Sequence, residues 1–175
     1  MTLMLEDLDG ATRPHMLAEL DRDEGPPDRV YVSSRLSGRG QAEYRGLLRE
    51  ALARGTTGSF ELALSTPGVL NDRERRVREG TPYLAAMPSN AAQVMAEGQF
   101  NRYYIRGLCL RVLDEGGGEV QVYRARPSLK PRPESQRMIG RLLDPALLLD
   151  DLRLHLRDEP TLLPFVNSGL TVRVA

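Results

Sequence analysis

The chain has 175 residues, 41% of them hydrophobic and 27% charged, and its 24 basic and 24 acidic side chains give a formal net charge of zero. This length and composition are typical of one packed soluble domain. No apolar run approaches 18 residues, which excludes a transmembrane helix, and the single cysteine, Cys109, excludes an internal disulfide and a cysteine-based zinc site. The acidic start, MTLMLEDLDG, lacks the features of a secretory signal, so we expect a cytoplasmic protein.

The charges are unevenly distributed along the chain. Residues 1–30 contain eight acids and three bases, whereas residues 99–141 contain nine bases and four acids. Lys130 is the only lysine, and this preference for arginine suggests a bacterial, GC-rich source. The acidic and basic regions could neutralise each other within one molecule, do so between two molecules, or serve separate partners.

The first half of the chain predicts mainly helices. We expect a helix over 11–22, a short strand over 29–33 and an amphipathic helix from Ser37 to Gly55. Another short helix is expected before Pro67-Gly68. The segment NDRERRVREG (71–80) mixes signs without an apolar face, which predicts an exposed turn or loop, and TPYLAAMP after it predicts a short strand.

The second half begins with the longest predicted element, a helix from Ser89 or Asn90 to about Leu113. Its glycines at 98 and 107 indicate close packing against a neighbour or a break. We expect a half-buried strand over 119–125, and then an irregular basic loop, because three prolines interrupt residues 126–137. Asp144-Pro145 predicts the start of another helix, and residues 168–174 predict a final strand that could form an exposed edge.

Strands separated by helices favour an α+β fold. We therefore predict a single domain over residues 1–175, with a small mixed sheet packed against about four helices. The strands of this sheet are expected near 29–33, 119–125 and 168–174.

The sequence contains none of the common catalytic or nucleotide-binding motifs, such as GxSxG, Walker A, GxGxxG, HExxH or CxxC. His15 and His155 are interpreted as structural, and Cys109, beside the apolar face of the long helix, as a buried structural cysteine. We expect no cofactor and no bound metal.

Asp114 and Glu119 flank the glycine run at 116–118, as acids do in some metal-dependent nucleases. Such a site requires a lysine two residues after the second acid, and Gln121 occupies that place. A nuclease is therefore only the third reading of the sequence, and enzymatic activity in general is not expected.

The strongest functional signal is the density of cations in YRARPSLKPRPESQRMIGR (123–141) and on the helix before it. Arginine and tyrosine are favoured at protein interfaces, and the same cations could bind nucleic-acid phosphates. A structural alternative is that they pair with the chain's own acids. The candidate binding residues for protein or phosphate are Arg102, Arg106, Tyr123, Arg124, Arg126, Lys130, Arg132 and Arg137.

From these observations we predict a non-enzymatic accessory protein that binds a protein partner, or itself, through an arginine-rich surface, without contact to a membrane. The alternative is a nucleic-acid-binding protein that uses the same surface. We expect a protein partner to order the segment 71–80 and the proline-rich loop.

Overall fold

The computed structural model describes residues 2–128, 130–156, 160–163 and 168–175. These residues form helices and two small antiparallel sheets, with the helices and strands interspersed along the chain. This arrangement confirms the expected α+β fold. Among the described residues, no helix is long and apolar enough to cross a membrane.

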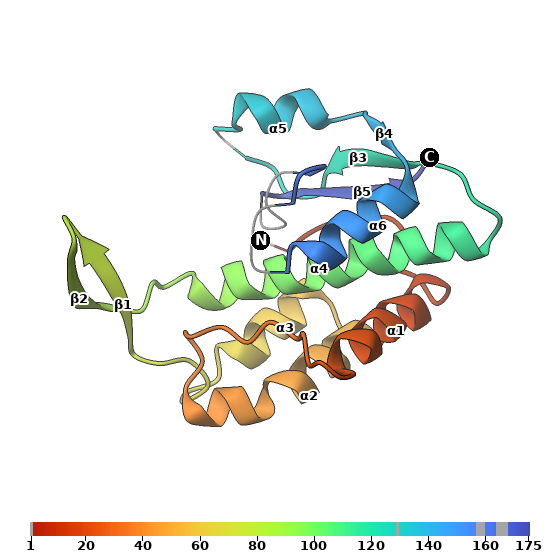
Figure 1. The fold of residues 1–175 in the computed structure, drawn as a ribbon. Helices are drawn as coiled ribbons and strands as arrows, with labels where there is room; N and C mark the ends of the chain where they lie inside the picture. Colours follow the sequence, from red (N-terminus) through yellow and green to blue (C-terminus); the bar gives the residue numbers. More distant parts are fainter. Residues whose placement is uncertain (1, 129, 157–159, 164–167) are drawn as a thin grey trace.

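The long helix α4 (Ala91–Asp114) is the centre of the fold (Figure 1). Phe100, Tyr104, Leu108 and Val112 recur every four residues and are buried, as their spacing predicts. The helix continues through Gly98 without a break. Neighbouring elements bury almost its whole circumference, so most of its residues between Ala91 and Val112 are inaccessible to solvent.

Three helices cover one side of α4: α1 (Thr12–Glu24), α2 (Gly38–Arg54) and α3 (Thr57–Leu64) (Figure 1). Helix α2 begins where the sequence predicts, because the Ser37 hydroxyl accepts a hydrogen bond from the Gly40 amide at 3.0 Å. A fourth helix, α6 (Pro145–Leu154), also packs on α4, and the Asp144 carboxylate caps its first turn.

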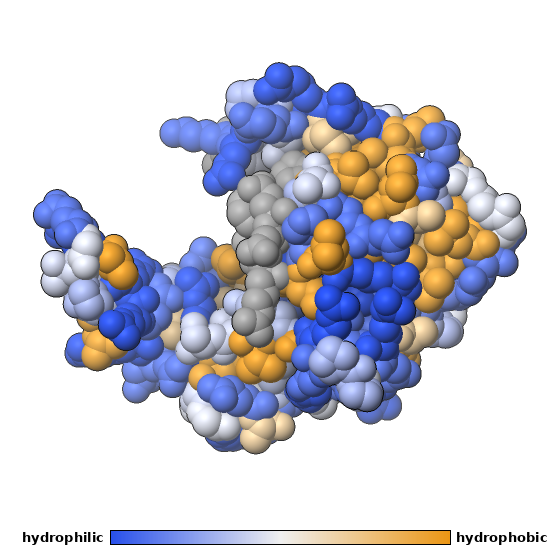
Figure 2. All heavy atoms as spheres, in the orientation of Figure 1, coloured by the Kyte–Doolittle hydropathy of each residue, from blue (hydrophilic) through white to orange (hydrophobic). Residues whose placement is uncertain are grey.

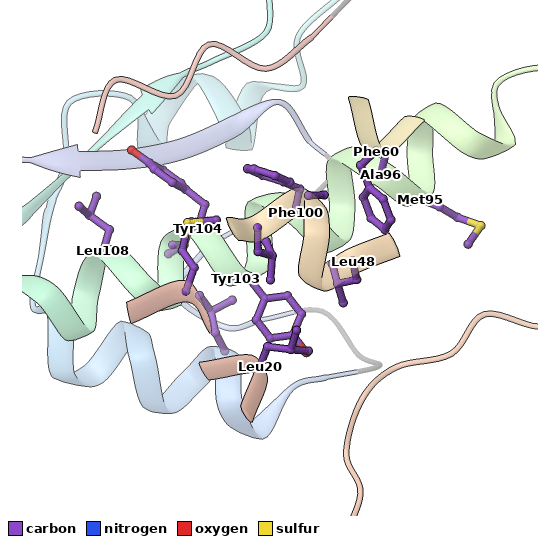
Figure 3. Close-up of a cluster of buried hydrophobic side chains, with 14 of the residues drawn as sticks. Leu20, Leu48, Phe60, Met95, Ala96, Phe100, Tyr103, Tyr104 and Leu108 are labelled. Carbon is purple, nitrogen blue, oxygen red and sulfur yellow. The ribbon is translucent and has the colours of Figure 1, made fainter. Parts of the chain in front are cut away.

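Side chains from these helices interlock around α4 (Figure 3). Leu20 of α1, Leu48 of α2 and Phe60 of α3 are all buried, and they meet Phe100 and Tyr103 of α4. One continuous hydrophobic cluster therefore joins the helices and extends to the sheet on the far side of α4.

The sheet above α4 has the strand order β4-β3-β5, from β3 (Val120–Arg124), β4 (Leu142–Leu143) and β5 (Leu170–Val174). Val122 of β3 lies opposite Val172 of β5, and both are buried against the core. Strands β3 and β5 occur where the sequence predicts them, and β5 is an edge strand of this sheet. All pairs are antiparallel, so the expectation of a mixed sheet is wrong.

Residues 29–33 do not form the predicted strand. The segment buries Val30 and Ser33, three residues apart, and leaves Val32 exposed, so its burial does not alternate as in a strand. The prediction rested on its valine and tyrosine content alone. The segment runs on the side of α4 occupied by α2 and α3, away from the three-stranded sheet (Figure 1). Among the described residues, no strand pairs with it there.

Residues 71–80 are a strand and a turn rather than a loop. Strand β1 (Arg73–Arg78) pairs in antiparallel register with β2 (Thr81–Ala86), through a two-residue turn in which Glu79 and Gly80 both have positive φ. Positive φ at both central residues gives the strands the twist that a hairpin requires. The sequence pattern missed β1 because neither face of this strand is covered, so no apolar alternation marks it.

The proline-rich segment also contains regular structure, the short helix α5 (Pro133–Met138). Pro133 opens this helix, at the position where a missing N–H costs no hydrogen bond. The described residues thus form six helices instead of about four. The short helix α3 lies where one was expected before Pro67-Gly68, and α5 is the helix that the sequence did not predict.

Candidate interaction site

The acidic N-terminal part is neutralised mostly from within the molecule. Of the eight carboxylates in residues 1–30, Asp7 alone forms no ion pair among the described residues, and its Oδ2 accepts the Val174 amide instead. The other seven pair with arginines spread along the chain: Arg45, Arg49, Arg106, Arg111, Arg153 and Arg173. The structural alternative considered for the sequence, pairing of the basic region with these acids, therefore holds for Arg106 and Arg111, whereas the other pairing arginines lie outside residues 99–141.

Arg106 is the centre of a buried ion network. Its side chain is completely buried on α4, with Nη2 2.6 Å from Glu19 Oε2 and Nη1 2.6 Å from Asp23 Oδ2. Burial opposes its charge, but the hydrogen bonds and charges of Asp23 and Glu19 outweigh this, so the pKa of Arg106 is raised. The guanidinium also lies 5.1 Å from the ring centre of Tyr103. Arg106 thus holds α1 against α4, and no partner can reach it in this fold.

Arg102, one turn before Arg106, has a different environment. It is only 5% exposed, and its Nη1 donates to the carbonyl oxygens of Leu152 at 3.4 Å and His155 at 2.6 Å. No carboxylate lies within ion-pair distance of it in the described part of the chain, and its Nε has no hydrogen-bond partner there. Burial and the nearby Arg106 lower the pKa of Arg102, although arginine remains protonated in proteins.

The strand candidates are engaged with neighbouring elements. The Tyr123 hydroxyl accepts from the Glu6 amide and donates to the Met4 carbonyl, both at 2.9 Å, and therefore ties the N-terminal segment to β3. Arg126 lies 3.3 Å from the buried Glu97 carboxylate. Arg124 is partly buried and contacts Gln136 of α5 at 3.4 Å.

Lys130, Arg132 and Arg137 are exposed around α5, and none forms an ion pair with a described residue. The structure thus divides the eight candidate residues among three places: the interior of α4, the strand β3 and the surface at α5. They do not form one continuous patch.

The residues weighed for catalysis lie in different surroundings. Cys109 is buried in the core, and burial raises the pKa of its thiol, which confirms the expected structural cysteine. His15 contacts Asp114 at 3.1 Å, and His155 contacts Asp151 at 3.0 Å. Glu119 is exposed. Among the described residues, no group of three or more metal-ligating side chains comes together.

The most exposed regular element is the β1–β2 hairpin, hereafter the arm (residues 73–86), which projects from the body beyond the start of α4 (Figures 1 and 2). Cross-strand partners share a face, so Arg75 lies beside Leu84, and Val77 beside Pro82. Val77 is 68% exposed and Leu84 64%, which leaves this apolar face of the arm uncovered. The sequence signal that could have revealed the arm is Gly80, which suits the positive φ of a hairpin turn just before the short strand TPYLAA.

The opposite face of the arm fixes its base to the body. Glu74 lies 2.7 Å from Arg35 and 2.6 Å from Arg76, and its own side chain is largely buried. These hydrogen bonds and the charges of Arg76 and Arg35 outweigh a small desolvation cost and lower the pKa of Glu74. The arm is thus held at its root and free towards its tip.

A groove with a volume of 630 Å³ lies between the root of the arm, the segment 31–35 and the first turns of α4. Arginines from three elements line it, namely Arg35, Arg73, Arg75 and Arg102. Apolar groups from Val94, Met95 and Leu156 form another part of the wall. Arg102 is therefore the one residue among the eight sequence candidates that lines this groove.

Comparison of this chain with protein-family models, with curated proteins and with solved structures found no match. Its function must therefore be inferred from the molecule's own chemistry.

Proposed function

We propose that this chain is a non-enzymatic interaction module that binds a protein partner through the arm and the groove at its root. The observation that carries the proposal is the exposed apolar face of the arm, formed by Val77, Pro82 and Leu84. An isolated two-stranded hairpin is only marginally stable in water. A partner that covers this face would stabilise the hairpin and remove apolar surface from solvent.

The composition of the arm favours protein over nucleic acid as the partner. Arg73 and Arg75 share the face of Val77 and Leu84 and lie on its root side. Arginine beside an apolar patch is typical of protein interfaces, whose centres are apolar and enriched in arginine. A surface that binds phosphates alone gains nothing from two exposed aliphatic side chains beside its cations.

The charge distribution favours a different protein over a second copy of this chain. Arg73, Arg75 and Arg78 of the arm form no ion pair with a described residue. The chain's own acidic region, residues 1–30, is already used in internal ion pairs. The acidic region of a second copy would therefore have to break internal ion pairs to bind the arm, whereas an acidic protein with unpaired carboxylates would match its charge directly.

Affinity purification from the source cells tests this proposal. The tagged wild type is compared with V77S/L84S and with the control L62S/L147S, in which the replaced leucines are similarly exposed, at 74% and 63%, but lie on α3 and α6. We expect a protein that wild type and control retain equally and that V77S/L84S loses by about tenfold or more.

Two results would argue against the proposal. One is that wild type, V77S/L84S and L62S/L147S retain the same proteins. The other is nuclease-sensitive recovery of nucleic acid that the arm variant does not change but R132Q/R137Q removes, which would favour the alternative function.

A further inference from the structure

We infer that the groove at the root of the arm binds a carboxylate of an extended acidic segment of the partner, with Arg102 as its inner ligand. This inference rests on the proposed function and specifies the chemistry that the partner presents. For the groove to bind such a segment, it needs a cation without a carboxylate partner, further hydrogen-bond donors at its rim, and a wall that a peptide can contact.

The cation at the inner end of the groove is Arg102, which differs from its neighbour Arg106 in its partners. Both lie on α4 and both are buried, but among the described residues Arg106 contacts two carboxylates, whereas Arg102 forms no ion pair and donates to two backbone carbonyls. An ionised side chain removed from water is costly unless an opposite charge compensates it. A carboxylate bound in the groove would supply that charge beside Arg102.

The rim of the groove adds cations at its outer end. Arg73 and Arg75 line it from the arm and form no ion pair with a described residue, whereas Arg35 is already engaged by Glu74. Two arginines at the entrance and one at the inner end suit a ligand that carries more than one acidic group. An extended peptide presents alternate side chains on one face, so it can offer more than one carboxylate to these arginines.

The remaining wall favours a peptide over a polyphosphate. Val94, Met95 and Leu156 provide apolar contacts, and the groove volume of 630 Å³ accommodates several extended residues. Glu74 also lines the groove, and its carboxylate would repel a doubly charged phosphate more strongly than a single carboxylate. Acidic side chains alternating with apolar ones fit both parts of the wall.

The test is fluorescence anisotropy of the full-length protein with a labelled peptide of alternating glutamate and leucine. We expect saturable binding, and a peptide with glutamine in place of glutamate should bind about tenfold more weakly or worse. R73Q/R75Q should weaken binding of the glutamate peptide by about tenfold, and the control R132Q/R137Q, which removes the same charge near α5, by no more than about twofold.

Several outcomes would overturn the inference. They are the absence of saturable binding at millimolar peptide, equal losses for the two arginine pairs, and tighter binding of single-stranded DNA that competes with the peptide. R102K, which keeps the charge but loses the planar fork, should also weaken binding. Because R102K could perturb the fold, the exposed pair R73Q/R75Q carries the test.

The proposed function and this inference fail separately. If V77S/L84S abolishes recovery of the cellular partner while R73Q/R75Q leaves both that recovery and peptide binding unchanged, the arm is the interface and the groove is not its acidic subsite. If the groove binds the peptide but the arm variant keeps its partner, the proposed role of the arm is wrong.

Discussion

Two arginines one turn apart on α4 behave differently because of what faces them. Arg106 meets Glu19 and Asp23 from α1, and Arg153 of α6 reaches Glu19 as well. This cluster joins three helices through charges buried in the core. Arg102 instead meets carbonyl groups at the end of α6 and lines the groove. One residue is therefore structural, and the other is available to a ligand.

Replacing Arg106 by methionine tests the structural role. The change would leave the Asp23 carboxylate buried without its cation and weaken the compensation of Glu19, so we expect the free energy of unfolding to fall by about 3–5 kcal/mol. Urea denaturation measures it. The control Arg22→Ala, at an exposed position of α1, should change stability by no more than about 0.5 kcal/mol. Equal stability of the Arg106 variant and wild type would contradict this account.

The same network predicts sensitivity to acid. Burial of Glu19 opposes its ionisation, but the hydrogen bond from Arg153 and the charge of Arg106 outweigh burial, so its pKa lies below the ordinary value of 4.5. A lowered pKa in the folded state contributes stability above the unfolded value and loses it as the pH falls through the folded value. Urea unfolding from pH 6 to pH 3 should therefore show a smaller loss of stability for Glu19→Gln than for wild type. Parallel curves would show that Glu19 does not carry this effect.

At the residue scale, features set by neighbouring positions in the sequence were predicted, whereas contacts between distant positions were missed. Burial of Cys109 and close packing at Gly107 follow from their places on one helix. The pairing of Arg106 with Glu19 joins residues 87 positions apart, and no spacing rule reports it. Arg106 and Arg102 look equivalent in the sequence, because only the fold determines which carboxylates come near each.

At the scale of elements, the contact between α1 and α4 depends on a glycine. A Cβ added at Gly107 would lie 2.7 Å from the Met16 nitrogen and 2.9 Å from its Cα, which are backbone atoms that cannot move aside alone. The two helices therefore approach more closely here than any other residue permits.

Gly107→Ala should lower the free energy of unfolding by about 1–3 kcal/mol, because overpacking exceeds the gain in helix propensity. The matched control is Gly46→Ala on α2, where nothing lies within 4 Å of the added Cβ. That change should raise stability by about 0.5–1 kcal/mol. Urea denaturation of both variants provides the comparison, and stabilisation by Gly107→Ala would refute the close contact.

The arm is an element that the core does not need. Its strands pair with each other, and the Met87 amide donates to the Asp72 carbonyl at 2.8 Å across its base. Replacing residues 73–86 by a short glycine-serine turn should therefore alter the free energy of unfolding by less than about 1 kcal/mol and abolish partner binding. Circular dichroism and urea denaturation measure the first effect. A large loss of stability would mean that the arm is part of the folding unit.

The helices with an apolar stripe in the sequence were predicted well: α2 and α6 with their capping residues Ser37 and Asp144, and the long helix α4 with its start after Asn90. The elements that the sequence concealed, β1 and α5, are exposed, and exposure removes the periodicity that such predictions use. The segment 29–33 was wrongly predicted as a strand because its β-forming residues, Val30, Tyr31 and Val32, find no neighbouring strand to pair with among the described residues. The element proposed as functional is thus one that hydrophobic patterning could not detect.

At the scale of the whole molecule, a net charge of zero conceals an unequal distribution. The acids of the first 30 residues are used in internal ion pairs, whereas the arm and the surface around α5 keep cations without such partners in the described part of the chain. The location of this unpaired charge, beside an uncovered apolar face, supports binding of an acidic protein at one side of the molecule.

The most direct test of this central claim is site-specific photo-cross-linking in the source cells, with a benzophenone amino acid at Leu84 of the arm and, separately, at the equally accessible Leu62 of α3. The account predicts a discrete protein adduct from position 84 that Arg73→Gln/Arg75→Gln weakens, and no such adduct from position 62. Adducts that are identical at both positions, or an adduct at position 62 alone, would contradict it.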